Sequence, residues 1–516
     1  MAELKGREKQ IVDERIKKIA GLRENGIEVY AHRFDLSEKR IHSVDVKDKF
    51  SNLKEEEKSG KIRVIAGRIM GKRAFGKLNF FEVQDLKGSI QVIVQKGEVS
   101  DEVLSSFKDI DGGDIVGVEG EVVKTKSGEI SIMASRIDIL TKAVLPLPDK
   151  HAGLKDEEER LRKRYLDIIM NEDVKKMFIA KSRFWNSMRN FLIDRGFLEV
   201  ETPVLENSAG GAAANPFITH HNALDLDVYL RISMGELWQK KLLVAGYEKT
   251  FEIGRQFRNE GMDAEHLQDY TQMEFYWGYV DFRTGMKLCE EMYKAVAMAT
   301  IGSLKFSAQG HEVDMGKKWE VYDFAETILK ETGVDVFAAS KKEIVAKLIE
   351  LNMEHDAKVD KWRLADTLWK FCRKKLSGPG FLVGHPIELS PLSKTSKEDS
   401  RKVERFQIIL AGSECGNGYS ELNDPIDQEA RFIEQAKLGE KGDEEAMDHD
   451  EEFVEALKYG MPPACGFGVS ERLFAFFMGK PARECVAFPL MKPATTHNLE
   501  GKDTIRTKNK SPNPKK

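Results

Sequence analysis

The chain has 516 residues with 41% hydrophobic content, enough to bury more than one core, and this length predicts two to four domains. The formal net charge of −5 argues against a uniformly basic nucleic-acid binder, while leaving room for a local basic face. Five scattered cysteines without a CxxC pair argue against a disulfide framework or a zinc site, and no apolar run is long enough to suggest a membrane span. Because the N-terminus is charged from the start, we expect no secretory signal and a soluble, cytoplasmic protein.

Residues 1–60 are predicted to form a helical lead into the first domain. Between residues 3 and 25, three isoleucines and Leu22 recur at helical spacing among Lys, Arg and Glu. This pattern suits two interpretations equally: a solvated helix that packs on a neighbouring element, and a basic arm that contacts RNA.

Residues 61–146 show short alternating runs that indicate β-strands. The five expected strands cover residues 62–70, 78–85, 89–95, 114–123 and 129–140, and a helix is expected over 100–111. Five strands with a helix after the third favour the oligonucleotide/oligosaccharide-binding (OB) barrel. Prolines in the segment LPLPDK, residues 145–150, mark the end of this domain.

Residues 147–498 mix helices and strands. The segment 181–196 predicts an amphipathic helix ended by Gly196, and the strand-like FLEVETPVL that follows contains Pro203, which places it at an edge or an interface. A glycine-poor stretch near 317–376 reads as a helical insertion, after which strand-like runs return at 381–389, 405–412 and 415–422. The tail 499–516 is polar, basic and proline-containing, so we expect it to be disordered.

A hairpin over residues 251–279 combines charged and aromatic residues. Strand periodicity places Gln272, Glu274 and Tyr276 on one face of its second strand, and Met273 and Phe275 on the other. The even-numbered positions of the first half are also polar, namely Glu252, Gln256, Arg258 and Glu260. A polar face inside a large domain indicates a site, although a charged surface hairpin would show the same pattern.

Glu414 and Glu421 are seven positions apart in the sequence, and Asn417 and Tyr419 lie between them. Seven is an odd number, so a straight strand would direct the two carboxylates to opposite faces. They could share a metal ion only if the strand had a bend or bulge, for which Gly416 or Gly418 would serve. The spacing alone therefore does not establish a metal site.

Several ordered motifs resemble those of the class II lysyl-tRNA synthetases. They are FRNEGMD followed by ME, HPIELSPLSK, GNGYSELNDPIDQ and the final SERL, together with GRIM, GDIVGVEGEV, TKSGE and RYLDII earlier in the chain. The resemblance extends over roughly residues 62–493 and implies an α+β protein. It would have an OB-fold anticodon-binding domain at 61–146 and a catalytic domain at 147–498, built on six or seven antiparallel strands flanked by helices.

The resemblance implies that ATP activates L-lysine to lysyl-adenylate with release of pyrophosphate, and that lysine then passes to the 3′ end of tRNA(Lys). The implied ATP-binding residues are Arg258, Glu260, His266, Tyr270, Glu414 and Arg472, of which Arg258 and Arg472 are catalytic. The implied lysine-binding residues are Gly211, Glu236, Glu274, Tyr276, Asn417 and Tyr419. Glu414 and Glu421 match carboxylates that bind Mg²⁺. Guanidinium groups and Mg²⁺ can stabilise the charge on phosphorus without a protein nucleophile.

The same resemblance implies partners for both domains. Pro203 matches a position at a homodimer interface, and the barrel residues Arg73, Phe80, Gln91 and Glu129 match positions that contact the anticodon. An aromatic ring can stack on a splayed base, but periodicity alone allows Phe80 to be a core residue as well. Nearby lysines form a local basic face that suits contact with phosphates.

Three departures from the family pattern affect the proposed site. RISMGEL stands where RxAPEL is usual, His266 is followed by Leu267 instead of asparagine, and the last motif is shortened to GFGVSER with Glu471 in its acidic position. We expect activity to be retained, because the carboxylate is kept.

Other functions remain open at this point. Aspartyl- and asparaginyl-tRNA synthetases share the fold, but their substrates would leave Glu236 and Glu274 unpaired, which favours lysine. A non-catalytic paralogue that only binds RNA or a protein partner is disfavoured because Arg258, Arg472 and both candidate magnesium carboxylates are present. A paralogue that charges a protein lysine is disfavoured because such enzymes lack the barrel.

Overall fold

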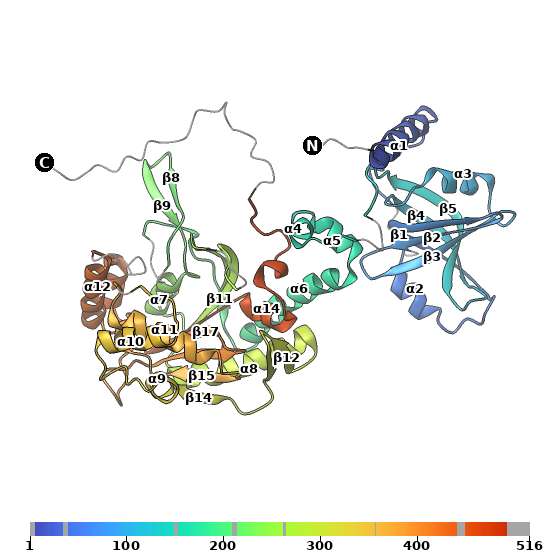
Figure 1. Ribbon diagram of the computed structural model, residues 1–516. Helices are drawn as coiled ribbons and strands as arrows, with labels where there is room; N and C mark the ends of the chain where they lie inside the picture. The colour runs from blue at the N-terminus through green and yellow to red at the C-terminus, as the bar shows by residue number, and fades with distance from the viewer. Residues whose placement is uncertain are drawn as a thin grey trace. The chain divides into compact units, whose positions relative to one another are not determined.

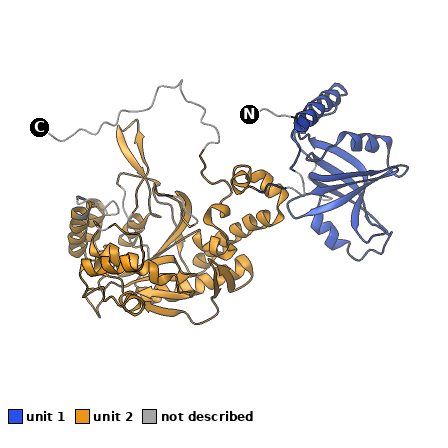
Figure 2. Cartoon of the chain, viewed as in Figure 1, with its two compact units in different colours: residues 1–155 blue, residues 156–516 orange. Residues whose placement is uncertain are grey.

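The computed structural model describes residues 6–34, 40–148, 153–208, 214–261, 265–356, 358–440 and 449–492. The chain divides into two compact units, residues 1–155 and 156–516, each with its own hydrophobic core (Figure 2). The expected basic tail at 499–516 lies outside the described residues, and so does Gly211.

Unit 1 contains a closed five-stranded barrel with the strand order β1-β2-β3-β5-β4, as the sequence predicts. Side chains alternate along each strand, so that Phe81, Val83, Val92 and Val94 fill the interior. Its elements are α1 (Gly6–Glu24), α2 (Ser43–Lys49), β1 (Lys58–Phe75), β2 (Leu78–Gln84), β3 (Ser89–Gln95), α3 (Asp101–Asp109), β4 (Ile115–Lys124) and β5 (Ile130–Thr141).

Helix α1 packs on the barrel through both apolar and charged side chains. Val12, Ile19 and Leu22 are buried, and Ile19 and Leu22 belong to the barrel core. Arg15 donates hydrogen bonds to three backbone carbonyls, those of Gly112 at 2.8 Å, Ala143 at 2.8 Å and Leu145 at 3.1 Å. The structure therefore favours the packed helix over the basic arm.

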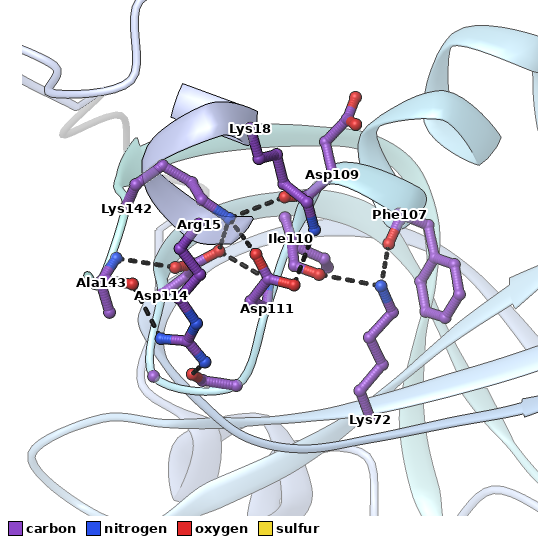
Figure 3. A network of polar contacts seen from close by, with 12 residues as sticks. Arg15, Lys18, Lys72, Phe107, Asp109, Ile110, Asp111, Asp114, Lys142 and Ala143 are labelled. Atoms are coloured by element: carbon purple, nitrogen blue, oxygen red, sulfur yellow. Dashed lines mark hydrogen bonds and ion pairs between the residues drawn. The ribbon is translucent and has the colours of Figure 1, made fainter. Parts of the chain in front are cut away.

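A buried lysine connects this helix to the end of the barrel (Figure 3). The ammonium of Lys142 is fully buried and lies 2.7 Å from Asp111 Oδ2 and 2.5 Å from Asp114 Oδ2. Lys18 of α1 pairs with the other oxygen of Asp111 at 2.7 Å. Because a buried charge is stable only when it is paired, this network fixes α1 and the last strand to the loop that precedes β4.

Unit 2 is built on an eight-stranded sheet with the order β14-β15-β16-β17-β18-β11-β10-β6. The central strands pair antiparallel, as expected, but the outer pairs β14–β15 and β6–β10 are parallel. The two outer strands are short, β6 with two residues and β14 with four, so periodicity could not reveal them.

The strands and helices of unit 2 alternate irregularly along the chain. The strands are β6 (Leu198–Glu199), β7 (Leu205–Glu206), β8 (Ile218–His221), β9 (Leu226–Leu230), β10 (Lys249–Phe257), β11 (Asp269–Gly278), β12 (Lys305–Ala308), β13 (His311–Asp314), β14 (Glu320–Asp323), β15 (Gly380–Val383), β16 (Arg405–Leu410), β17 (Ser413–Ser420) and β18 (Ala464–Ser470). The helices are α4 (Glu157–Arg162), α5 (Arg164–Met170), α6 (Glu172–Ile193), α7 (Glu236–Val244), α8 (Phe282–Ile301), α9 (Phe324–Thr332), α10 (Lys341–Glu350), α11 (Lys361–Arg373), α12 (Pro425–Glu440), α13 (Glu451–Lys458) and α14 (Arg472–Met478), with short 3₁₀ turns at Ile387–Leu389 and Ala482–Cys485.

Helices cover the sheet and leave one of its faces to build a site. The long helices α6 and α8 bury residues such as Phe184 and Met292 against Phe275 and Phe467 of the central strands. Helices α9, α10 and α11 follow β14 and precede β15 along the chain, where the sequence predicts a helical insertion, and they form a separate apolar cluster. Among the described residues, no helix is both long enough and apolar enough to cross a membrane.

Candidate active site

A cavity of about 570 Å³ in unit 2 collects nearly all of the residues expected in the catalytic domain. Its lining includes residues of α7, β11, α11, β16, β17 and β18, and of the loop that follows β10. The expected residues that line it are Glu236, Arg258, Glu260, His266, Tyr270, Glu274, Tyr276, Glu414, Asn417, Tyr419, Glu421 and Arg472.

The two faces of the hairpin are those predicted by its period of two. Met273 and Phe275 are fully buried in the core. On the other face, Gln272 donates to Glu274 Oε1 at 2.6 Å, and the Tyr276 hydroxyl donates to Glu274 Oε2 at 3.1 Å. The polar face therefore points into the cavity and not to open solvent.

Three buried carboxylates gather at one end of the cavity. Glu236 is 7% exposed, Glu274 is 6% exposed and Glu421 is 1% exposed. Burial, with the nearby charge of Glu236, raises the pKa of Glu274 to about 7. Burial also raises the pKa of Glu421 to about 8, against the opposing attraction of Lys240. Such an arrangement is costly when empty and is suited to bind cationic groups.

Tight packing holds this acidic end in place. A Cβ atom added at Gly466 would lie 2.2 Å from Glu421 Oε1, so only glycine fits there. Gly235, directly before Glu236, has a left-handed backbone with φ +65°, and a Cβ there would lie 2.1 Å from Thr202 Oγ1. Glycine thus accommodates the extra residue of RISMGEL, and Glu236 still reaches the cavity.

Two guanidinium groups lie along the rest of the cavity. Arg472 Nη2 lies 2.6 Å from His266 Nε2, and its Nη1 donates to the carbonyl of Glu414 at 3.1 Å. Arg258 donates to the carbonyl of Ile232 at 3.3 Å. The charges of Arg258 and Arg472 both act on the Tyr270 hydroxyl, although burial raises its pKa overall. A planar anionic ligand would find both positive charge and an aromatic ring here.

The bulge expected in the strand between the two candidate magnesium ligands is present. Across β16 and β17, Gln407 pairs with Asn417 but Ile409 pairs with Glu414, so one extra residue stands in β17 next to Gly416. As a result Glu414, Asn417, Tyr419 and Glu421 all face the cavity.

The two carboxylates have different surroundings in the cavity. Seven residues of strand, at about 3.3 Å each, keep their backbones roughly 20 Å apart. Glu414 accepts hydrogen bonds from Trp369 at 2.7 Å and Gln407 at 3.1 Å, whereas Glu421 Oε2 lies 2.7 Å from the ammonium of Lys240. The two carboxylates therefore have different partners within the cavity. In the described part of the chain, no cluster of three or more His, Cys, Asp or Glu side chains could hold a metal by itself.

The four expected anticodon residues share the outer face of the barrel in unit 1. The strand register places Arg73 opposite Phe80, and Gln91 opposite Ser131. Phe80 is half-buried, while its neighbour Phe81 is 2% exposed and belongs to the core. Glu129 is exposed just before β5. Of the two interpretations of Phe80, the structure supports the outward-facing ring.

Sequence reasoning missed several residues of the cavity. Arg405 donates to Asn417 Oδ1 at 2.7 Å, and Gln407 donates to Glu414. Both lie on β16 at alternate positions, a signal that period-two reading could have used. Lys240, one turn after Glu236 in α7, lies behind the acidic end. Glu265 lies 3.5 Å from Arg472 at the other end.

Comparison with known proteins agrees with this geometry. Residues 156–492 match the family described as class II tRNA synthetases (D, K and N), and residues 64–140 match an OB-fold nucleic acid binding domain. A lysine–tRNA ligase of Staphylococcus epidermidis is 43% identical over 486 residues, which cover 93% of this chain and 97% of the relative.

Two further relatives carry the same name. The lysine–tRNA ligase of Pelotomaculum thermopropionicum is 42% identical over 504 residues, covering 96% of this chain and 97% of its own length. That of Thermosipho africanus is 40% identical over 504 residues, covering 96% and 99% respectively. The chain belongs to the class II tRNA synthetases of the D, K and N group, with an OB-fold domain before its catalytic domain.

Proposed function

We propose that this chain is a lysine–tRNA ligase. It activates L-lysine with ATP, releases pyrophosphate, and transfers lysine from the adenylate to the 3′ end of tRNA(Lys). The observation that carries the choice of amino acid is the buried acidic end formed by Glu236, Glu274 and Glu421. The lysine–tRNA ligases that resemble the chain over nearly its full length support the same choice.

Lysine matches this end because it carries two ammonium groups. Glu274 already accepts three hydrogen bonds, from Met234 N, Gln272 and Tyr276, so its position is fixed before lysine enters. Neither oxygen of Glu421 accepts a hydrogen bond of good geometry within the described residues. We therefore assign Glu421 to the ε-ammonium, and Glu236 and Glu274 to the remaining contacts with the amino acid.

ATP would occupy the end that holds the two arginines. Arg258 would contact the α-phosphate and the lysine carboxylate, Tyr270 would stack on adenine, and Arg472 with His266 would contact the outer phosphates. Both guanidinium groups are in place to stabilise charge on phosphorus while the lysine carboxylate attacks it and pyrophosphate leaves. Because the nucleophile comes from the substrate, the chain needs no catalytic Ser or Cys, and its five cysteines are free and buried.

Magnesium would accompany the nucleotide at the same end. Mg²⁺ is commonly held by one or two carboxylates together with substrate phosphates, and it neutralises charge on them. Glu414 fits this role because it lines the cavity beside Arg472. Glu421 does not fit it, because an ammonium occupies its side. We also propose a cytoplasmic location, because thiols stay reduced there and the five cysteines are free.

Amino-acid-dependent pyrophosphate exchange tests the proposed reaction. We expect exchange with lysine and none above background with aspartate or asparagine, because either would leave buried carboxylates unpaired. Because lysine, aspartate and asparagine are compared in the same assay, each amino acid serves as a control for the other two. Exchange with aspartate but not lysine would assign the chain to another enzyme on this fold, and no exchange with any of them would favour a binding protein.

We also propose that the barrel reads the tRNA anticodon through Arg73, Phe80, Gln91 and Glu129. Replacing Phe80 with alanine removes a ring that can stack on a base, so the KM for tRNA in lysine charging should rise about 10- to 100-fold. Pyrophosphate exchange should stay near normal, because it does not use tRNA. Leu86→Ala, at an exposed site of the same unit, is the matched control. Equal losses in charging and exchange would contradict the assignment.

A homodimer through the Pro203 region is the third part of the proposal. Strand β6 forms one edge of the large sheet, and the ribbon β8–β9 projects from unit 2 (Figure 1). Leu198 is 49% exposed, Leu205 is 50% exposed and Ile218 is 61% exposed, all in this region. Exposed apolar side chains that gather beside a free edge indicate a surface for a partner.

The molar mass in solution, measured by light scattering, tests this dimer. We expect a dimer for the unmodified chain and mostly monomer for Ile218→Asp, because a charge in an apolar interface is costly. Ile349→Asp is the matched control, since Ile349 is equally exposed at 62% but lies on α10. A dimer that survives Ile218→Asp would place the interface elsewhere.

A further inference from the structure

A lysine of the chain itself lies against the acidic end of the cavity. Lys240 is 1% exposed, and its ammonium lies 2.8 Å from Glu236 Oε1 and 2.7 Å from Glu421 Oε2. Glu236 and Glu421 line the cavity, but Lys240 does not. The ammonium thus reaches both carboxylates from the protein side and leaves their cavity side to a ligand.

The position of Lys240 follows from helix geometry. Glu236 opens α7, and Lys240 follows it by four residues, so both side chains lie on the same face of the helix. Glu421 comes from the end of β17 and meets this face. Burial alone would lower the pKa of Lys240, but the two carboxylates raise it above its ordinary value. The side chain is therefore a permanent cation within the wall of the cavity.

The hydrogen bonds of Glu236 show which of its two carboxylate oxygens can bind a ligand while Lys240 contacts the other. Lys240 and the Tyr419 hydroxyl both donate to Oε1. Among the described residues, no donor contacts Oε2. Lys240 therefore orients the carboxylate so that one oxygen is satisfied internally and the other faces the cavity.

The charge of this end also depends on Lys240. When all of them are ionised, the three buried carboxylates of Glu236, Glu274 and Glu421 stand against one buried ammonium, which gives a formal charge of −2. Lysine presents two ammonium groups to this end, while its carboxylate turns to the phosphate. The pocket charge thus matches the two positive charges of lysine. Without Lys240 it would hold one carboxylate too many, and an unpaired buried charge is strongly destabilising.

We propose that Lys240 is a positioning residue for amino-acid selection: it holds Glu236 and Glu421 and sets the pocket charge to the two ammonium groups of lysine. This inference rests on the proposed function as a lysine–tRNA ligase. Without Lys240, one buried carboxylate has no cation beside it. It must then take up a proton, or its side chain must turn out of the pocket. Either response deprives the ε-ammonium of its partner.

The test compares lysine with the analogue that carries a hydroxyl group in place of the ε-ammonium. In Lys240→Met we expect the ratio of kcat/KM for lysine to that for the analogue to fall at least about tenfold, mostly through the lysine KM. The kcat for pyrophosphate exchange should change little, since the ATP end is untouched. Lys241→Met is the matched control, because this next residue of α7 lies 3.6 Å from Glu452 and packs over the Trp238 ring.

A double variant makes the test independent of the stability of Lys240→Met. Glu421→Gln alone leaves a formal pocket charge of −1, whereas Lys240→Met/Glu421→Gln restores −2. The double variant should therefore bind lysine better than the single one, with a KM about tenfold lower. A merely structural role for Lys240 would make the double variant worse.

Two results would overturn the inference. One is an unchanged lysine-to-analogue ratio in folded Lys240→Met, and the other is a lysine KM in the double variant equal to or above that of Glu421→Gln. Both are measured against the unmodified protein. If that protein shows no lysine-dependent exchange, the proposed function fails first, so the two failures are distinguishable.

Discussion

Replacing Arg258 with methionine should lower kcat for lysine-dependent pyrophosphate exchange about 10³-fold. Methionine keeps much of the aliphatic length but removes the guanidinium that would contact the α-phosphate and the lysine carboxylate. This charge matters most when the carboxylate attacks phosphorus, because negative charge then builds up between the two reactants. The KM values for ATP and lysine should change less than kcat.

Arg255→Met provides the matched control for this experiment. Arg255 lies three residues earlier, near the end of β10, but its side chain is 43% exposed and pairs with Asp269 at the surface. Its loss should change kcat by no more than about twofold, since exposed ion pairs contribute little. A small effect of Arg258→Met, comparable to that of Arg255→Met, would remove Arg258 from the catalytic centre.

Glu274→Gln should raise the lysine KM about 10²-fold, which corresponds to about 2.7 kcal/mol. Glutamine has nearly the same shape, so Met234 N and Gln272 can still donate to its oxygen, and the Tyr276 hydroxyl can turn to accept from its amide. The fold should therefore be retained while one negative charge disappears from the pocket. The KM for ATP should remain close to that of the unmodified protein.

Glu252→Gln is the matched control for the second prediction. Glu252 stands directly opposite Glu274 in the hairpin register, but it pairs with Arg231 at 2.6 Å and accepts from Thr202. Its replacement should lower the thermal unfolding temperature and leave the lysine KM unchanged within about twofold. An unchanged lysine KM in Glu274→Gln would remove Glu274 from the lysine pocket.

The pH dependence of lysine binding provides a second readout for Glu274. Because its pKa is raised to about 7, its neutral form becomes dominant below that pH. Lysine requires the carboxylate, so the lysine KM of the unmodified protein should rise as the pH falls through 7 and through the range just above it, where Glu421 also takes up a proton. The ATP KM measured over the same range should not follow this pattern.

Much of this architecture could be predicted because local periodicity determines it. The alternation around Glu274 assigned three polar residues to one face, and the structure confirms this assignment. The five barrel strands are equally visible in the sequence, since each spans seven residues or more and turn residues separate them. Periodicity could not decide between Phe80 and Phe81, because it separates two faces without showing which one meets the core.

Features that depend on distant segments could not be predicted in the same way. A lysine among other charged residues of a helix, such as Lys240, resembles a solvated side chain until β17 brings Glu421 to it. For the same reason, the spacing of Glu421 from Glu414 predicts a bulge, but not what either carboxylate contacts. The two short outer strands of the large sheet depend on neighbours for their existence as well.

Because of the bulge in β17, the binding of both substrates depends on the number of residues in this strand. Upstream of it stands Glu414 at the nucleotide end, and downstream stand Asn417, Tyr419 and Glu421 at the amino-acid end. Deleting one residue there would turn every downstream side chain to the opposite face, whereas deleting two would preserve the facing and only shorten the strand. Length variation among descendants of this chain should therefore be tolerated here in pairs of residues, because a single-residue change would disconnect amino-acid recognition from nucleotide recognition.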